Sequence, residues 1–484
     1  MRRPLIERRT RRTAREARQR GVTMAMVALS LVALISMAAL SIDLGSLYEA
    51  KAEAQRAADL GALAAARIIS LEGLTGDSTA GPADVAWRAV CGSASSPASV
   101  AAINVAQQNL INGSAASTVT VNYGTTGSFT SDCSAATGTG FTVNPEVQVY
   151  VQQASLPSFF SRIFSLVVTG GTSNSGVSAT ATAEIFNPSG SGSLSSGMVP
   201  AQPKCVKPLI VPNSDPENYA NPFLNTNGSI VNPGISPLGQ GVIGESFILK
   251  SACSSGSATS CNPPPANNPP KSTSGGPGSA GSLQYVPATV TGTPIAVASN
   301  ASCSSLNAGS TYQLAIAGCD QSTVYACGTP NAVTPNLLGE NPVYPNAASG
   351  DTATAVQCLI NSTVTPDGPD ILAGPPTAPT YPFAIQAGNG NPLVQAGVAS
   401  YNDIVTTSNN IVTLPIYDSN PSIPLTPASQ VTILGFLQVF IENIDTTTGN
   451  LTVTVLNVTG CSNDAASGTS ANGTSPVPIR LITP

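Results

Sequence analysis

Side chains that could perform catalysis are few in this 484-residue sequence. The chain contains no histidine, which excludes a Ser-His-Asp triad and a Cys-His pair. The phosphate-binding pattern Gly-x-x-x-x-Gly-Lys-Ser/Thr does not occur, because the string PPKST that begins at Pro269 lacks the glycines. The carboxylates are scattered, so no acid/base pair can be located. We therefore predict a protein that is not an enzyme and that binds no cofactor. An exported hydrolase with a Ser-Lys or carboxylate site is the enzymatic alternative, and no positioned base is visible for it.

One loop carries oxygen ligands at close spacing. In the string Asp367-Gly368-Pro369-Asp370, two carboxylates lie within four residues, and carboxylates are the ligands that Ca²⁺ prefers. The same residue types dominate ordinary turns, because they bond to their own local backbone. We favour the turn and predict no metal site.

The cysteines indicate disulfides rather than a metal centre. No two of them have the Cys-x-x-Cys spacing, and the missing histidine removes mixed zinc sites. An even number of cysteines in an exported chain is typical of disulfide bonds. Two pairs, Cys253–Cys261 and Cys319–Cys327, each enclose seven residues and are candidates for local bridges, although some cysteines could simply be buried. The ten positions are Cys91, Cys133, Cys205, Cys253, Cys261, Cys303, Cys319, Cys327, Cys358 and Cys461.

An uncharged apolar segment covers residues 22–42. About 20 such residues span a bilayer core, whereas the apolar part of a secretory signal is about 7–15 residues long. A pilin-type leader would resemble Arg20-Gly21, but the fifth residue after that glycine is Met26 and not the expected glutamate. We therefore predict a permanent transmembrane helix, and keep a signal cleaved near Ser41 and a pilin-type leader as alternatives.

Charge predicts the orientation of this helix. The first 20 residues contain nine arginines and two glutamates, a net charge of +7, while the rest of the chain has a net charge of −13. Basic flanks stay in the cytoplasm, so residues 1–21 form a cytoplasmic tail and residues 43–484 lie in the periplasm or outside the cell. Beside a membrane anchor, topology and lipid contact explain the basic tail better than nucleic acid does. Only 9% of all residues are charged while 42% are hydrophobic, which is typical of an exported protein that still buries a core.

A proline-free helix is expected to follow the membrane segment, over residues 43–69. Small and apolar residues recur along it at a spacing of three and four, and form a smooth face for close packing against another helix. Its partner is either the exported part of the same chain or another molecule. Asp43 lies on the same face at the membrane boundary, where it either has a function or marks the point at which the helix meets water. The predicted helix-packing stripe consists of Leu47, Ala50, Ala54, Ala57, Gly61, Ala64 and Ile68.

This N-terminal region resembles the TadE/TadG group, and specifically TadG-like proteins, which are associated with assembly of Flp pili by the tight-adherence (Tad) system. Members of the group combine a basic tail, an apolar helix, the pattern Asp-x-Gly-x-x-Tyr and an Ala-rich helix with Gln-x-Ala-Ala-Asp-x-x-Ala-Leu-Ala. The chain matches through Asp43, Gly45, Tyr48, Gln55, Ala57, Ala58, Asp59, Ala62, Leu63 and Ala64, and it departs from the usual alanine at Gly61.

A second stretch, residues 147–185, is similar to the segment that closes the first exported module of this group. Val147, Val149 and Val151 alternate with polar residues as in a half-buried strand. A short helix is expected from Pro157, and a second strand in GVSATATAEI. With a helix over Ala83–Leu110 that contains Trp87, and a strand from Ser117, we predict an α+β module with a small antiparallel sheet over residues 43–190.

The remaining chain is predicted to be mostly β. A Gly/Ser linker occupies residues 191–200, and residues 201–484 contain a Pro/Gly-rich loop near 261–282. Strands are expected from Ser310, Asn410, Gln430 and Asn450, separated by Asn/Gly/Pro-rich turns. Some TadG-like proteins contain a von Willebrand type A domain with a metal-binding Asp-x-Ser-x-Ser. The string YDSNPS at Asp418 has the wrong spacing for it.

These observations predict a membrane-anchored envelope protein that takes part in Flp/Tad pilus assembly or anchoring through helix packing. Its expected partners are the membrane and other Tad proteins or a second copy of the chain, and not nucleic acid. Two alternatives stay open: a surface adhesin whose exported β region binds a substratum, and a pseudopilin that enters the fibre.

Overall fold

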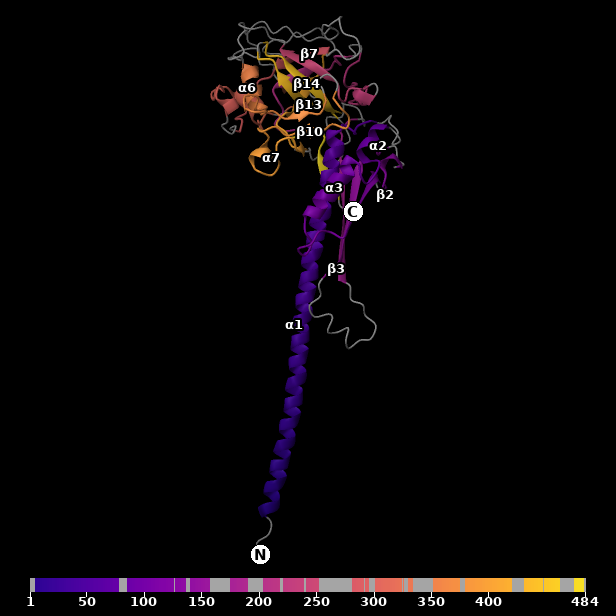
Figure 1. Ribbon diagram of the computed structural model, residues 1–484, viewed down its shortest axis with the longest axis vertical. Helices are drawn as coiled ribbons and strands as arrows, with labels where there is room; N and C mark the ends of the chain where they lie inside the picture. The colour runs from indigo at the N-terminus through magenta and orange to yellow at the C-terminus, as the bar shows by residue number, and fades with distance from the viewer. Residues whose placement is uncertain are drawn as a thin grey trace. The chain divides into compact units, whose positions relative to one another are not determined.

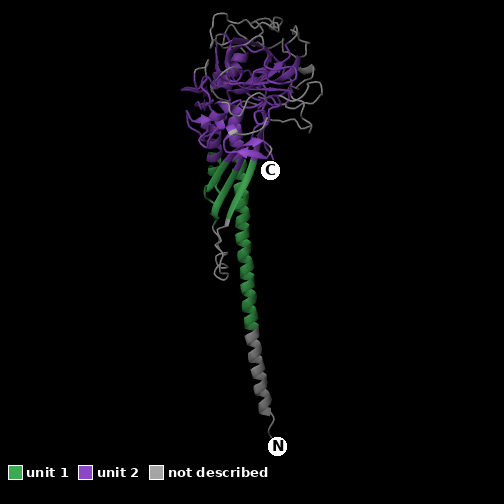
Figure 2. Cartoon of the chain, turned by 90° about the vertical axis from the view of Figure 1, so that its right-hand side faces the viewer, with its two compact units in different colours: residues 1–60, 104–120, 150–181 green, residues 61–103, 121–149, 182–484 purple. Residues whose placement is uncertain are grey.

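The computed structural model shows one long helix followed by mixed helices and sheets, so the coarse α+β prediction is confirmed (Figure 1). Contacts divide the chain into two units, coloured in Figure 2: residues 1–60, 104–120 and 150–181, and residues 61–103, 121–149 and 182–484. The structure describes residues 5–77, 85–125, 127–135, 140–156, 175–189, 203–217, 221–238, 241–251, 281–290, 292–295, 301–323, 325, 330–333, 351–374, 379–419, 431–446, 448–461 and 474–482.

Helix α1 runs without interruption from Leu5 to Leu71. The apolar segment and the Ala-rich segment therefore form one continuous helix, as their lack of proline predicts. The helix ends where Gly73 adopts a positive φ of 67° and the amide of Leu74 donates to the carbonyl of Ile69. A left-handed glycine just after the last turn is a common helix terminator. A Cβ atom at Gly73 would also lie 2.6 Å from the carbonyl oxygen of Leu456.

The predicted single helix over Ala83–Leu110 is wrong, because two helices occupy this region. Helix α2 covers Val85–Cys91 and helix α3 covers Pro97–Gln108. Proline has no amide hydrogen and disfavours helical geometry at the residue before it, here Ser96. Pro97 therefore begins a new helix, and the side chain of Ser96 accepts a hydrogen bond from the amide of Ser93 at 2.9 Å in the connecting turn.

A five-stranded sheet has the order β15-β4-β3-β1-β2. Its strands are β1 (Thr118–Thr125), β2 (Ser128–Thr130), β3 (Glu146–Leu156), β4 (Ser175–Ile185) and β15 (Ile479–Ile482). The predicted strands from Ser117, Val147 and the GVSATATAEI string are confirmed, and Val147, Val149 and Val151 are all buried. The pairing of β15 with β4 was not predicted; an ion pair of 2.7 Å between Arg480 and Glu184 accompanies it.

A seven-stranded sheet is built from the second half of the chain, in the order β12-β5-β7-β6-β14-β13-β8. Because β12 also pairs with β13, six of these strands close into a ring, with β8 added at β13. The strands are β5 (Leu209–Pro212), β6 (Ser246–Ser251), β7 (Gly281–Pro287), β8 (Pro330–Val333), β12 (Ile411–Tyr417), β13 (Val431–Ile444) and β14 (Leu451–Gly460). The strands predicted from Asn410, Gln430 and Asn450 are confirmed.

The strand predicted from Ser310 is wrong, because helix α5 covers Thr311–Ala317. Ser310 caps this helix and accepts a hydrogen bond from the amide of Gln313 at 3.2 Å. The spacing Ser-x-x-Gln is a capping signal that the apolar content of the segment obscured. Tyr312 contacts helix α6 (Asp351–Leu359) through a hydrogen bond of 3.0 Å to Thr352.

Smaller elements complete the described fold. A three-stranded sheet has the order β11-β10-β9, from Ile404–Val405, Ile385–Gln386 and Ile371–Leu372. Helix α7 covers Pro392–Gln395, and short 3₁₀ turns lie at Cys133–Ala135, Ser236–Leu238 and Ala301–Cys303. The predicted helix from Pro157, the linker at 191–200 and nearly all of the loop near 261–282 lie outside the described residues.

The described disulfides join Cys91 to Cys133, Cys205 to Cys319, and Cys303 to Cys358, and Cys461 is also disulfide-bonded. The predicted Cys319–Cys327 bridge is therefore wrong. The fold brings the Cα atoms of Cys205 and Cys319 to 4.4 Å across 114 residues of sequence, which spacing along the chain cannot reveal. The predicted Cys253–Cys261 pair lies outside the described residues.

Candidate helix-packing interface

The predicted stripe on helix α1 is only partly buried. Ala50, Ala54, Ala57 and Gly61 are buried, whereas Leu47, Ala64 and Ile68 are half-buried. From Ala57 onward the buried face continues through Ala58, Ala62, Ala65 and Ile69. The predicted stripe repeats every 3.5 residues, but a straight helix has 3.6 residues per turn and drifts by about 20° per heptad. The buried face therefore moves away from Ala64 and Ile68.

Strand β4 lies against the buried face in the first unit. The amine of Lys51 donates to the carbonyl of Ser178, and the side-chain amide of Gln55 donates to the carbonyl of Thr180 at 3.1 Å. The buried methyl side chains of Ala50 and Ala54, each one residue before these contacts, allow the helix backbone to approach the strand closely. Around these residues, the Ala-rich face packs within the chain itself, which is one of the two arrangements that the sequence left open.

Gln55 and Asp59 explain part of the Gln-x-Ala-Ala-Asp pattern. The Gln55 amide nitrogen also donates to the carboxylate of Asp59 at 2.8 Å, across one helical turn. This bond orients Gln55 toward the strand. On the same helix, the carboxylate of Glu53 accepts from the backbone amide of Asn112 at 2.6 Å. These polar contacts were not predicted, although the i, i+4 spacing of Gln55 and Asp59 was visible in the sequence.

The opposite face of helix α1 is exposed. Leu44 is about half exposed and Tyr48 is 70% exposed. Gly45 and Ala52 are exposed on the same side, and nothing lies within 4 Å of a Cβ atom placed on Gly45. We call Leu44, Gly45, Tyr48 and Ala52 the exposed stripe. It contains the glycine and the tyrosine of the Asp-x-Gly-x-x-Tyr pattern.

Asp43 does not share this exposure. Its side chain is only 7% exposed, although its neighbours Ile42 and Leu44 are exposed, and it takes part in an interaction within the chain. The hydroxyl of Ser46 donates to its backbone carbonyl at 2.9 Å. A functional role for Asp43 at a membrane boundary stays a prediction.

The upstream part of helix α1 presents apolar side chains on all sides. Among the described residues, α1 is the one helix that is long and apolar enough to cross a membrane by length and composition. The large exposed side chains are Met24, Met26, Val27, Leu29, Leu31, Val32, Leu34, Ile35, Met37, Leu40 and Ile42. A helix that is hydrophobic all round is typical of a membrane span or a buried core helix.

The C-terminal end of α1 is held by polar contacts inside the second unit. Arg67 donates through Nη2 to the carbonyl of Thr406 at 3.2 Å, and Asn457 donates to the carbonyl of Ser70 at 2.9 Å. The carboxyl of Glu72, just after the helix, accepts from the amide of Phe383 at 2.8 Å, and burial raises its pKa to about 8. The helix end is thereby tied to residues more than 300 positions later in the chain.

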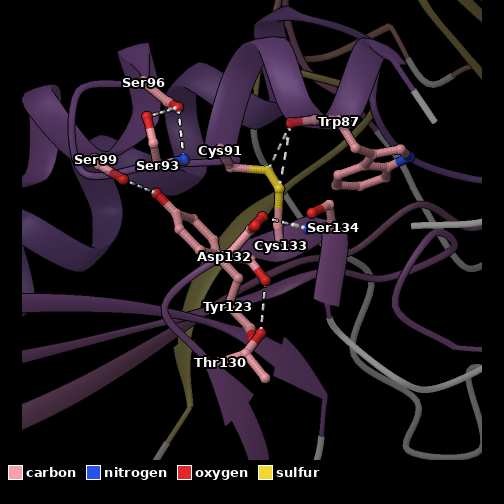
Figure 3. The surroundings of a disulfide bond; sticks show 10 residues. All are labelled: Trp87, Cys91, Ser93, Ser96, Ser99, Tyr123, Thr130, Asp132, Cys133 and Ser134. Carbon is pink, nitrogen blue, oxygen red and sulfur yellow. Dashed lines mark hydrogen bonds between the residues drawn. A yellow bond between two sulfur atoms is a disulfide. The ribbon is translucent and has the colours of Figure 1, made fainter. Parts of the chain in front are cut away.

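A disulfide links helix α2 to the 3₁₀ turn at Cys133, and a hydrogen bond links helix α3 to the sheet (Figure 3). Cys91 at the end of α2 is bonded to Cys133, and both sulfurs lie close to the carbonyl oxygen of Trp87. The hydroxyls of Ser99 in α3 and Tyr123 in β1 are hydrogen-bonded at 2.7 Å. Burial raises the pKa of Tyr123 to about 12, so its hydroxyl stays protonated.

The carboxylates of the Asp367–Asp370 loop accept hydrogen bonds from later residues of the chain. Asp370 is buried and accepts from the amide of Gly388 at 2.8 Å, from Asn391 at 2.8 Å and from Ser408 at 2.5 Å. Asp367 accepts from the hydroxyl of Tyr401 at 3.1 Å. These protein donors occupy the positions that a cation would need. In the part of the chain that the structure describes, no group of three acidic, cysteine or histidine side chains could hold a metal ion.

Comparison with known proteins identifies the N-terminal segment. Residues 21–67 match the family described as putative Flp pilus-assembly TadE/G-like, so the resemblance seen in the sequence is confirmed. The matched residues cover the apolar part of α1 and most of its Ala-rich part. The match supports a role in the Tad pilus system, and the family description concerns assembly rather than catalysis. No curated protein and no solved structure matches the chain.

Proposed function

We propose, from the TadE/G-like segment at residues 21–67, that this chain is a membrane-anchored, non-enzymatic component of Flp/Tad pilus assembly. The apolar part of α1 anchors it in the cytoplasmic membrane with the basic tail inside. The exported part follows the same helix along the chain. The exposed stripe packs against a helix of another Tad component or of a second copy.

Exposure supports the membrane anchor. The large apolar side chains between Met24 and Ile42 are uncovered, and leaving them in water would cost about 0.8 kcal/mol for each CH₂ group. A span of about 20 residues at 1.5 Å per residue matches a bilayer core of about 30 Å. The net charge of +7 before the segment favours a cytoplasmic N-terminus.

Disulfides support export of the remaining chain. Cys91–Cys133, Cys205–Cys319 and Cys303–Cys358 link residues that are 42, 114 and 55 positions apart. Such bonds form and persist in oxidising compartments and are rare in the cytosol. The periplasm or the cell exterior is therefore the expected location of residues 43–484.

The exposed stripe is the part of α1 that remains available to a partner. Ala54 and Ala57 are fully buried, so a partner cannot reach them without separating α1 from its own sheet. Gly45 leaves room for close approach of a second helix, and Tyr48 offers a large, uncovered ring beside it. A tyrosine at this depth could instead anchor the helix in the membrane interface, and this is the arrangement that the test must exclude.

The decisive experiment replaces Tyr48 with glutamate in the full chain, in a bacterium with a functional Tad system. We expect loss of co-purification with Tad components and loss of piliation, while the amount of protein in the membrane is unchanged. Val100→Glu, on the exposed side of α3, is the matched control and should leave both unchanged. Normal association and piliation of Tyr48→Glu would show that the exposed stripe is not a partner surface. Loss of membrane retention would indicate the interfacial-anchor role instead.

The adhesin alternative has its own test. A strain without pilus genes that displays the full chain would adhere to the substratum if the exported β region binds directly. The full chain is required because β15 pairs with β4 and Arg67 bonds to Thr406, so a fragment starting near residue 198 would lose both contacts. The third possibility is a pseudopilin that enters the fibre. The intact mass of the mature protein tests it, since loss of the first 21 residues would indicate a pseudopilin.

A further inference from the structure

A cavity of about 420 Å³ lies in the second unit, close to the C-terminal end of α1. Its wall combines residues from distant parts of the chain, including Arg67, Lys207, Ser408 and Gln438, and the Cys205–Cys319 disulfide. The volume falls within the range of about 300–1,000 Å³ that is usual for small-molecule sites. It is large enough for a ligand of monosaccharide size.

The wall carries two cationic side chains and no described carboxylate. The positive charge of the described wall contrasts with the net charge of −13 carried by the chain after residue 20. Among the described residues, the salt bridge present is Arg480–Glu184, so neither Arg67 nor Lys207 has an acidic partner there. Buried charges are normally paired, so two cations without a described acidic partner in one cavity are a specific feature.

The side chain of Lys207 is hydrogen-bonded at the C-terminal end of helix α5. Its side chain is only 6% exposed, and its amine donates to the carbonyls of Gly318 at 2.6 Å and Ala315 at 3.4 Å. An ammonium group has three donors, so one donor is not used by these carbonyls. Burial lowers the pKa of Lys207 to about 7, because the charged form is separated from water without a neutralising anion.

Arg67 reaches the same cavity from helix α1. Within the described residues, one of its five donors is used, in the bond to the carbonyl of Thr406. Burial lowers its pKa as well, although arginine stays charged. The guanidinium group therefore retains donors in the paired geometry that suits a carboxylate or a phosphate group.

Two described acids adjoin residues of the wall and are already bonded. Asp370 accepts from Ser408, and Asp320, which follows Cys319, accepts from Ser322 at 2.8 Å and from Thr323. The wall contains no described aromatic side chain, and hydroxyl and amide groups make up much of it. This lining does not suit a flat aromatic ligand, and it does suit a hydrophilic one.

We propose that this cavity binds a small hydrophilic anion, whose carboxylate or phosphate group pairs with Arg67 and Lys207. The site is independent of the proposed contact between helices. Because its wall joins the end of α1 to residues of β12 and β13, an occupied cavity would stabilise the attachment of the helix to the β region.

The test is calorimetric titration of the full-length protein in detergent, near pH 8, with D-glucuronate and separately with inorganic phosphate. Glucose is the uncharged control. We expect saturable binding of at least one anion and none of glucose; the anion that binds identifies a carboxylate or a phosphate site. No saturation by either anion up to about 10 mM would overturn the proposal.

Two variants test the residues. Arg67→Gln should weaken anion binding by about tenfold or more, as expected for loss of a charged hydrogen bond, whereas Arg56→Gln on the exposed side of the same helix should not. An unchanged affinity of Arg67→Gln would refute the site. Titration in two buffers of different ionisation enthalpy adds a readout for Lys207: its free amine should take up as much as about 0.9 proton on binding near pH 8. The uptake should disappear in Lys207→Met, and persistence of the uptake there would exclude Lys207 as the partner of the anion.

Discussion

The buried carboxyl of Glu72 should make the folding stability of the second unit depend on pH. Its pKa is about 8 in the folded chain against the usual 4.5, chiefly because burial disfavours the charged form. Between these two values the folded state retains a proton that the unfolded state releases. Stability contributed by this group is therefore complete below about pH 4.5 and decreases as the pH rises to about 8.

Glu72→Gln removes this dependence while retaining a carbonyl oxygen for the amide of Phe383. At 1.36 kcal/mol per pKa unit, the stability of the variant relative to the natural protein should rise by about 4 kcal/mol between about pH 5 and pH 8.5. Lys207 changes stability in the opposite direction above about pH 7, because its pKa is lowered, but this contribution is common to both proteins and cancels in the difference.

The assay is urea unfolding of the full chain in detergent, followed by fluorescence. Trp87 is the single tryptophan, is buried in the second unit, and packs against Phe141 with ring centroids 4.8 Å apart. Glu49→Gln, at an exposed position of α1, is the control and should show a pH-independent difference. An equal stability difference for Glu72→Gln at both pH values would refute the assignment of a buried, protonated carboxyl.

Three further changes test the packing of the fold. Gln55→Ala removes two hydrogen bonds and should destabilise the first unit by about 1–3 kcal/mol, measured by thermal unfolding, whereas Arg56→Ala should change stability by less than about 0.5 kcal/mol. Ala54→Leu should lower the free energy of unfolding by about 1–3 kcal/mol through overpacking. Equal melting temperatures of Ala54→Leu and the exposed Ala52→Leu would contradict close packing on β4. Cys91→Ala removes the disulfide to Cys133 and should lower the free energy of unfolding by about 2–4 kcal/mol, measured by Trp87 fluorescence. A loss of less than about 1 kcal/mol would contradict a structural role of this disulfide.

Long regular elements were predictable from their own residues. Helix α1 lacks proline and is rich in alanine over many turns, and the strands β3, β13 and β14 carry β-branched and apolar residues over ten or more positions. In such segments the local preference is repeated often enough to outweigh tertiary context. The TadE/G-like motif lies in one of them, which is why the family could be recognised before the fold was known.

Short segments were decided by one or two residues. The segment after Ser310 has the apolar content of a strand, yet the Ser310 cap and the contact of Tyr312 with Thr352 make it a helix. The region around Pro97 contains two helices, and this proline begins the second of them. In both cases the signal was present in the sequence, but was weaker than the surrounding composition.

The sequence by itself determined the apolar anchor segment, the family motif and the tendency of each long element, because these depend on residues that are neighbours along the chain. Only the tertiary structure decided which face of α1 is buried, and it buries Ala65 and Ile69 rather than Ala64 and Ile68, in line with the drift of a straight helix. It also decided that Cys205 bonds to Cys319, and that Arg67 and Lys207 share one cavity. Such contacts join residues more than a hundred positions apart, so only the folded chain brings them together.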